Sequence, residues 1–329
     1  MPVLSVLDTS PIVSGSTART ALLNTLDLAV LADRLGYHRY WVPEHHGMRG
    51  VASAAPAVLI ARLAAATSRI RVGAGGVLLP NHAPIVVAEQ FGTLEAFHPG
   101  RIDLGIGRAA GGGPRAAAAV RADGERNAKP FADQLDELLG YLAADGTQAV
   151  HAVPAEGNTP AVWVLGTSAS SGALAGARGL PYAFAHHLKP DAMPVALAAY
   201  RSAFRPSSLL ERPKVLVSVA VVAAGTDERA EVLAWSAKRR FLARRQGKRI
   251  LLPPAEEAAA YPYTDGDRAL IDEQFAEVVV GSPATVVEGL RALQRRSGAD
   301  ELMIRTDVHD HADRRRSFEL VAATWTRPR

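Results

Sequence analysis

Short apolar segments and longer amphipathic stretches alternate about eight times along the 329 residues of this chain. The short segments, such as residues 3–7 and 215–223, are rich in Val, Ile and Leu and leave no face for water. Continuous apolar strands of this kind occur in parallel sheets that are covered by helices. About eight strand–helix units in this length favour closure into a (β/α)8 TIM barrel, formed by one domain over residues 1–329, over a doubly wound open sheet.

The apolar periodicity predicts where each element lies. The expected strands cover residues 3–7, 37–42, 70–79, 101–107, 161–165, 180–185, 215–223 and 301–304. Helices are expected over residues 17–35, 54–67, 84–97, 131–142, 170–178, 193–204, 227–245, 285–296 and 312–325. Residues 247–267 are polar and contain prolines, so we expect an irregular lid inserted between the seventh and eighth strands. Functional residues of a barrel gather at the carboxyl ends of its strands.

The composition excludes several classes of function. The chain has no cysteine, which rules out disulfides, thiolate metal sites and a cysteine nucleophile. Its 37 basic and 33 acidic residues are nearly balanced, and the basic runs at residues 238–249 and 314–316 are not interleaved with aromatic residues. Nucleic acid is therefore not expected as a partner. No apolar segment has the length of a membrane span and no signal peptide is recognisable, so we expect a cytoplasmic protein that binds no membrane.

An arginine and a glycine-rich turn follow the fourth expected strand. The guanidinium group of Arg108 would stand at the carboxyl end of this strand, where its donors suit a phosphate. An ion-pair partner at the barrel rim is an alternative role for Arg108. The run Gly105-Ile-Gly-Arg-Ala-Ala110 also matches a dinucleotide-binding fingerprint, with Asp123 or Glu125 near the spacing of a ribose ligand. Because its first two glycines lie inside the strand, we favour the phosphate site.

A run of hydroxyl residues, Thr167-Ser168-Ala169-Ser170-Ser171, follows the fifth expected strand and opens a helix. Ser and Thr are common N-caps, which is a purely structural explanation. The same hydroxyl groups and the free amides of a helix start also bind phosphate. Since the fourth and fifth strands are neighbours in a barrel, Arg108 and this run are expected to converge on one phosphate.

Two pairs of histidines, His45-His46 and His186-His187, follow the second and sixth expected strands. Adjacent residues point in different directions and neither pair has the spacing of metal ligands, so we expect no metal site. A histidine at a barrel rim is either a structural hydrogen-bonding group or a group that transfers a proton to a bound ligand. The sequence leaves both roles open.

Glycines interrupt the third expected strand at Gly73, Gly75 and Gly76. Glycine inside a strand is typical of a β-bulge or a tight kink. It also lets a flat ligand lie against bare backbone. Both interpretations place the glycines at the mouth of the barrel.

Together these motifs resemble the bacterial-luciferase-like family of flavin-dependent oxidoreductases. The resemblance covers nearly the whole chain and depends on the order and spacing of its motifs. They are Trp41-Val-Pro-Glu-His-His46, Ile70-Arg-Val-Gly-Ala-Gly-Gly-Val-Leu-Leu-Pro80, Ala88-Glu-Gln90, Gly100-Arg-Ile-Asp-Leu-Gly-Ile-Gly-Arg-Ala109 and Val280-Gly-Ser-Pro-Ala-Thr285. Within this family the chain is most similar to bacterial single-subunit members of unassigned substrate.

The resemblance implies a TIM barrel that binds reduced FMN, or in some branches the deazaflavin F420, at its carboxyl face. At the matching positions, His45 would assist the reaction at the flavin, and Gly75–Gly76 would form a non-prolyl cis peptide beside the flavin ring. Arg108 would hold the phosphate with the serines of the following unit. The expected cofactor-binding residues are Gly75, Gly76, Arg108, Thr167, Ser168, Ser170 and Ser171.

Two positions depart from the family's luciferases. Gly107 replaces a cysteine beside the flavin, and Thr167 stands where luciferase has a glutamate. Light emission and a long-chain aldehyde substrate are therefore not expected. Leu78, Phe184 and His186, together with the lid, are expected to line the pocket that selects the substrate.

The resemblance implies a monooxygenase that takes FMNH2 from a separate flavin reductase and uses O2 to oxidise a small organic substrate. An F420-dependent reductase and a flavin-binding protein without turnover are the alternatives. The lid would correspond to residues 246–267, and the basic run before it would help it close over an anionic cofactor. Family members commonly form dimers through the early helices, here residues 54–67 and 84–97.

Overall fold

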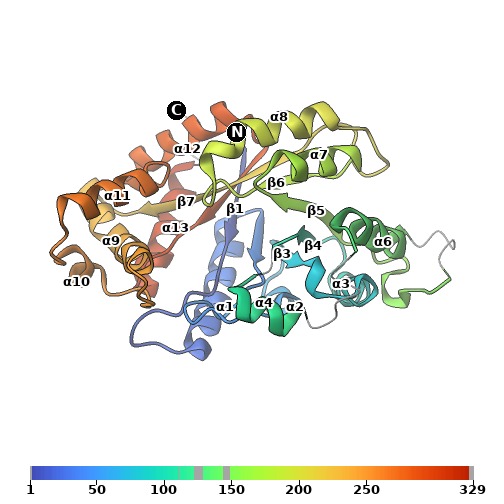
Figure 1. The fold of residues 1–329 in the computed structure, drawn as a ribbon, viewed down its shortest axis with the longest axis horizontal. Helices are drawn as coiled ribbons and strands as arrows, with labels where there is room; N and C mark the ends of the chain where they lie inside the picture. The colour runs from blue at the N-terminus through green and yellow to red at the C-terminus, as the bar shows by residue number, and fades with distance from the viewer. Residues whose placement is uncertain (1, 110, 122–128, 144–148, 326–329) are drawn as a thin grey trace.

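Eight parallel strands close into a barrel in this computed structural model, which describes residues 2–109, 111–121, 129–143 and 149–325 (Figure 1). The ring runs in the order β1–β2–β3–β4–β5–β6–β7–β9, and β9 closes it by pairing with both β7 and β1. The strands are β1 (Val3–Leu7), β2 (Arg39–Val42), β3 (Arg71–Leu78), β4 (Ile102–Gly107), β5 (Ala161–Gly166), β6 (Tyr182–Phe184), β7 (Val215–Ala223) and β9 (Glu301–Arg305). The predicted TIM barrel is confirmed.

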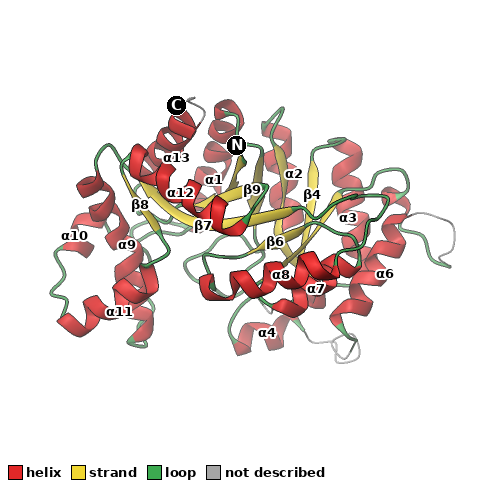
Figure 2. Cartoon of the chain, turned by 90° about the horizontal axis from the view of Figure 1, so that it is seen from above, coloured by secondary structure: helices red, strands yellow, loops and turns green. Residues whose placement is uncertain are grey.

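Helices cover the outside of the barrel, as the view from above in Figure 2 shows. Each predicted helix is present, with its ends within two residues of the expected ones. They are α1 (Ala18–Leu35), α2 (Pro56–Ala66), α3 (Pro84–Phe97), α6 (Phe131–Ala143), α7 (Ala169–Ala177), α8 (Met193–Ala203), α9 (Asp227–Arg245), α12 (Pro283–Ser297) and α13 (His311–Trp325). The short helix α4 (Pro114–Val120) was not predicted. Within the described residues, no helix is long and apolar enough to cross a membrane.

The dinucleotide-fingerprint alternative does not fit this architecture. A closed barrel replaces the open doubly wound sheet that such a fingerprint accompanies, and Gly105 lies inside β4 rather than in a turn after it. Ala110, Asp123 and Glu125 lie outside the described residues.

Two apolar layers hold the barrel together. Side chains such as Val72, Leu104 and Val217 fill the outer layer between the strands and the helices. Inside the barrel, Trp41 and Trp163 pack edge to face with ring centroids 5.6 Å apart. Because side chains fill the interior, the barrel is a packed core and not a channel.

A buried network of charges closes the amino end of the barrel. Arg39 lies between Asp103 and Glu301, with N–O distances of 2.8 and 2.7 Å. The other oxygen of Asp103 accepts from Arg71 at 2.7 Å. Leaving one of these buried charges unpaired would cost about 3–5 kcal/mol. The network therefore stabilises the amino end and leaves the carboxyl end for a ligand.

Residues 246–267 are more ordered than the irregular lid that the sequence predicts. They contain α10 (Ala255–Ala259) and the start of α11 (Asp265–Phe275), and both helices lie beside α9 at one edge of the barrel (left in Figure 1). The hydroxyl of Thr264 caps α11 by accepting from the amide of Asp267 at 3.1 Å. The prolines of this segment mark the ends of short helices, which periodicity over so few residues does not reveal.

The same segment contacts the carboxyl face of the barrel. Leu252 forms a β-bridge with Val13 in the loop that follows β1, and Ser14 donates its amide to the carbonyl of Leu252 at 2.9 Å. After α11, the short strand β8 (Val279–Gly281) pairs with the end of β7 outside the closed ring. A lid function of residues 246–267 stays a prediction.

Candidate active site

Candidate residues from five consecutive strands meet at the carboxyl end of the barrel. His45 follows β2, Gly76 lies near the end of β3, and Arg108 follows β4. Ser168 follows β5, and His187 comes soon after β6. Because all barrel strands are parallel, these positions share one face of the molecule.

The glycines of β3 contain the cis peptide that the family resemblance implies and the β-bulge that glycines inside a strand predict. The peptide bond between Gly75 and Gly76 is cis, as the family resemblance implies. The pairing of β3 with β4 also shifts register between Gly75 and Val77, which is a β-bulge. A Cβ atom on Gly76 would lie 2.5 Å from the carbonyl oxygen of Gly105, so the close approach of the two strands requires glycine here.

The buried carboxylate of Glu44, which precedes His45 and His46, fixes the segment after these glycines. Glu44 accepts hydrogen bonds from the amide of Leu78 (2.9 Å), the side chain of Asn81 (2.9 Å) and the ring of His82 (2.9 Å). Burial by itself raises the pKa of Glu44, but the hydrogen bonds from His82, Asn81 and Leu78 outweigh burial and lower it to about 2. An acidic residue directly after an apolar strand is the signal that could have revealed this role.

The two histidines after β2 diverge, as expected for adjacent residues. The ring of His46 bonds to Glu44 with an N–O distance of 2.7 Å. The ring of His45 makes no such contact, and its buried Nδ1 has no hydrogen-bond partner among the described residues. Burial, followed by the charge of Arg305, lowers the pKa of His45 to about 4. His45 is therefore a neutral imidazole at neutral pH.

His187 is a second imidazole near His45, and its protonation state is defined by its neighbours. The hydroxyl of Ser218 donates to the carbonyl of Phe184 (3.4 Å), so its lone pair is left to accept from Nδ1–H of His187 (2.7 Å). Burial and then the charge of Arg305 lower the pKa of His187 to about 3, and His45 is among the charges that influence it. The neutral ring thus presents Nε2 as a hydrogen-bond acceptor.

Two of the three residues expected to line the substrate pocket are placed elsewhere. Phe184 is completely buried in the apolar layer between barrel and helices, so the prediction for it is wrong. Its strand position turns it outward, because side chains alternate along a strand. His186 is also buried, with Nε2 3.5 Å from a carboxylate oxygen of Glu277, whereas burial and then the charge of Arg305 lower the pKa of its neighbour His187. Leu78 lies at the end of β3 and is almost completely buried.

The side chain of Arg108 is exposed and is able to bind an anion. Its side chain is exposed and makes no ion pair or hydrogen bond with the described residues, so the alternative role as an ion-pair partner finds no support. Ile106 pairs with Val164 across β4 and β5, which brings Arg108 next to the end of β5 and the start of α7.

The hydroxyl run after β5 satisfies its structural role and still leaves donors free. Ser168 and Ser171 form a capping box, and Ser170 contacts the hydroxyl of Ser168 at 3.0 Å. Thr167 is half-buried without a side-chain hydrogen bond among the described residues. The amides at the first two positions of α7 have no acceptor among these residues, since a helix supplies none there. Capping and anion binding are therefore compatible.

The described part of the chain contains no group of three His, Asp or Glu residues arranged to hold a metal ion. The carboxyl end of the barrel instead has hydrogen-bond donors without acceptors among the described residues after β4 and β5, backbone without side chains at β3, and two neutral imidazoles after β2 and β6. Groups of these kinds are able to bind a phosphate, to lie against a flat ring and to accept a proton.

Comparison with known proteins assigns the chain to a family. A family model for luciferase-like monooxygenase matches residues 1–301. The chain belongs to this family. The Bacillus subtilis protein YvbT is 44% identical over 324 residues, covering 98% of this chain and 96% of YvbT. A luciferase-like monooxygenase of Escherichia coli K12 is 43% identical over 317 residues, covering 96% of this chain and 95% of the relative.

Similarity extends to solved structures. The crystal structure of apo-MsnO8 superposes on this chain with a TM-score of 0.92 at 40% identity over the whole of both chains. A structure of the oxygenating constituent of 3,6-diketocamphane monooxygenase of Pseudomonas putida in complex with FMN has a TM-score of 0.73 at 24% identity over the whole of both chains. An F420-dependent secondary alcohol dehydrogenase has a TM-score of 0.69 at 14% identity over 99% of both chains. The last two share the fold of this chain.

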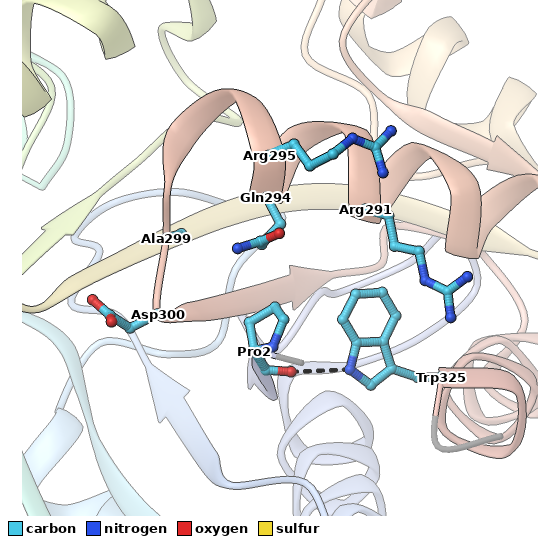
Figure 3. Close-up of a pocket in the computed structure, with 7 residues that line it drawn as sticks. All are labelled: Pro2, Arg291, Gln294, Arg295, Ala299, Asp300 and Trp325. Atoms are coloured by element: carbon cyan, nitrogen blue, oxygen red, sulfur yellow. Dashed lines mark hydrogen bonds between the residues drawn. The ribbon is translucent and has the colours of Figure 1, made fainter. Parts of the chain in front are cut away.

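A cavity of about 540 Å³ lies away from the candidate site, and Figure 3 shows the residues that line it. It opens at the amino end of the barrel, where the indole of Trp325 donates to the carbonyl of Pro2 at 3.0 Å. The residues that line it are Pro2, Arg291, Gln294, Arg295, Ala299, Asp300 and Trp325. Because active sites of TIM barrels lie at the carboxyl end, this cavity is not part of the candidate active site.

Proposed function

We propose that this protein is a monooxygenase that uses reduced FMN and O2 to oxidise a small organic substrate. The observation that carries the proposal is Arg108, whose side chain has no partner among the described residues, beside a helix start whose first two amides also lack an acceptor among them. A terminal phosphate is the ligand that satisfies such donors. Membership of the luciferase-like monooxygenase family supports the same conclusion.

The residues at the mouth also fit a flat ring. Gly75 and Gly76 leave the end of β3 without side chains, and His45 lies after the neighbouring strand. When bound, reduced flavin supplies the electrons that activate O2, chemistry that side chains do not provide. The protein would bind the phosphate, orient the ring and exclude water.

His45 is the residue that we assign to proton transfer. With a pKa of about 4 its ring is neutral at pH 7, so it has an acceptor nitrogen for a proton from a bound ligand. Glu44 acts as a positioning residue, because it bonds to His46 on one side and to the amide of Leu78 on the other.

Two further partners belong to this proposal. A separate flavin reductase would supply the reduced FMN. A second copy of the chain would pack against α2 and α3, where Val58 and Phe97 expose 74% and 76% of their surface. Exposed apolar side chains on neighbouring helices are typical of an interface between subunits.

An anaerobic titration with FMNH2, followed by mixing with oxygenated buffer, tests the proposal. We expect saturable binding, and reoxidation that is slower than that of free FMNH2 and coupled to product formation. N-Acetyl-S-methylcysteine is the first substrate to try, because a Bacillus subtilis relative that is 32% identical over 326 residues, 97% of both chains, is named N-acetyl-S-alkylcysteine monooxygenase.

Other outcomes of this titration identify the alternatives. Tight binding of FMN without oxygen consumption beyond that of free flavin would indicate a flavin-binding protein. Hydride exchange with F420 and indifference to O2 would indicate an F420-dependent reductase. No affinity for FMN in either redox state would refute the proposal.

A further inference from the structure

Two arginines share one carboxylate on the side of the barrel mouth that the phosphate cradle does not occupy. Asp307 accepts from Nη2 of Arg240, on α9, at 3.1 Å. It also accepts from Arg305, the last residue of β9, through Nε at 3.3 Å and through Nη2. The three side chains are partly buried, with 26%, 20% and 15% of their surfaces exposed for Arg240, Arg305 and Asp307.

This cluster carries an excess positive charge. Burial raises the pKa of Asp307, but the charges of Arg305 and Arg240 outweigh it and lower the pKa to about 2, so the carboxylate is ionised. One carboxylate therefore faces two guanidinium groups. The nearby Arg314 does not change the balance, because Asp8 neutralises it at 2.5 Å.

Donors of both arginines remain available. Nη1 of Arg305 and both Nε and Nη1 of Arg240 have no acceptor among the described residues, and none of them is a fully buried orphan atom. A half-buried guanidinium with unused donors is a common recognition element for carboxylates.

The cluster lies at the same carboxyl end of the barrel as the candidate active site, because Arg305 is the last residue of β9 and the strands of the ring are parallel. After burial, the charge of Arg305 is the largest influence on the pKa values of both His45 and His187. In the ring of eight strands, β9 lies opposite β4, which carries Arg108. A ligand phosphate held at Arg108 therefore does not reach Arg305, and a ligand group that binds Arg305 is a separate one.

We propose that Arg305 and Arg240 bind a carboxylate group of the substrate, so that this enzyme oxidises small organic acids. The inference rests on the proposed function for the location of the reaction, and it names the substrate class of that same site. The acid would span from the arginines toward the two neutral imidazoles, where its reactive part meets the oxidising centre. Because His45 and His187 are neutral, the excess positive charge of the two arginines remains available to the acid.

Matched acid and amide probes test the assignment. N-Acetyl-S-methylcysteine and its carboxamide, and likewise benzoate and benzamide, differ by one negative charge at nearly constant shape. With FMN-loaded protein, the change in the flavin absorbance reports binding. We expect each acid to bind about 10- to 100-fold more tightly than its amide, since hydrogen bonds to a charged group are worth that factor.

Variants test whether the two arginines cause the preference for an acid over its amide. Arg305→Gln and Arg240→Gln should remove it, and Arg305→Lys, which retains the charge without the planar fork, should retain part of it. Arg316→Gln is the matched control, because Arg316 is 62% exposed on α13 and remote from the mouth. Equal affinity of the wild type for acid and amide, no binding of either acid, or an unchanged preference in both Gln variants would overturn the proposal.

Cofactor titrations separate this inference from the proposed function. Arg305→Gln should bind FMN and FMNH2 as the wild type does. If it weakens FMNH2 alone and leaves the acid preference intact, the charge serves the reduced cofactor and the proposal is wrong. If the wild type binds no FMN, the proposed function fails, and calorimetry with the same acid and amide pairs on the unloaded protein still decides this inference.

Discussion

Replacing Glu44 with Gln removes the negative charge that organises the segment between the β3 glycines and α3. The carboxylate of Glu44 accepts from the amide of Leu78 and from the side chains of Asn81, His82 and His46. A Gln side chain has one acceptor oxygen, and its amide group is itself a donor. At least one buried donor therefore loses its partner in the variant.

The pKa of Glu44 sets the size of the effect. A carboxyl group with a pKa of about 2 in the folded protein and 4.5 in the unfolded chain stabilises the fold by about 3 kcal/mol at neutral pH. At about 2.1 cal/mol/K per residue, unfolding of 329 residues carries an entropy of about 0.7 kcal/mol/K, so this loss lowers Tm by about 4 °C. Because the folded pKa is depressed, the contribution is complete above about pH 4.5 and disappears as the pH falls toward 2.

Denaturant unfolding of the wild type and the Gln variant between pH 7 and pH 3 provides the measurement. We expect the difference in unfolding free energy to be near its full value at pH 7 and to shrink below pH 4.5. Glu288→Gln serves as the control, because Glu288 is exposed on α12 and makes no hydrogen bond with the described residues. A difference below about 1 kcal/mol at pH 7, or one that stays constant down to pH 3, would refute the role of Glu44.

Three further predictions address the cofactor, the second imidazole and the subunit interface. Arg108→Ala should weaken FMN about 10- to 100-fold and riboflavin hardly at all, because riboflavin lacks the phosphate; equal losses in a fluorescence titration would reject the assigned role. His187 should remain neutral with its proton on Nδ1 from pH 5 to 8, and in Ser218→Ala the proton should be shared between Nδ1 and Nε2. 15N NMR of the ring measures the tautomer, and a mixture of both tautomers in the wild type would contradict the prediction. Phe97→Asp should convert a dimer to the 34.8 kDa monomer in light scattering, whereas an unchanged mass would place the interface elsewhere.

Local sequence patterns predicted the elements and their order. The strand β7 (Val215–Ala223) and the helices α3 and α9 have the predicted bounds, because their apolar residues repeat with the period of a strand or a helix. Parallel pairing of eight apolar strands then brings the carboxyl ends together, so the positions of His45, Arg108 and Ser168 on one face followed from the order of elements. The cis peptide at Gly75–Gly76 followed from the family resemblance.

Short or polar elements escaped the same patterns. The helix α10 and the start of α11 lie in the segment that the sequence marks as irregular, since few residues and a polar composition give no clear period. The packing of α11 on α9 brings together Ile271 of α11, Leu242 of α9 and Tyr263, which precedes α11 in the chain.

The sequence by itself determined the barrel, the order of its strands and the family, because these depend on local periodicity and on motifs of adjacent residues. The tertiary structure decided which side chains act together. It paired His187 with Ser218, turned Phe184 into the outer core and set two arginines against Asp307. These outcomes depend on which face of a strand a residue occupies and on contacts between distant segments, and such contacts exist only once the barrel has closed.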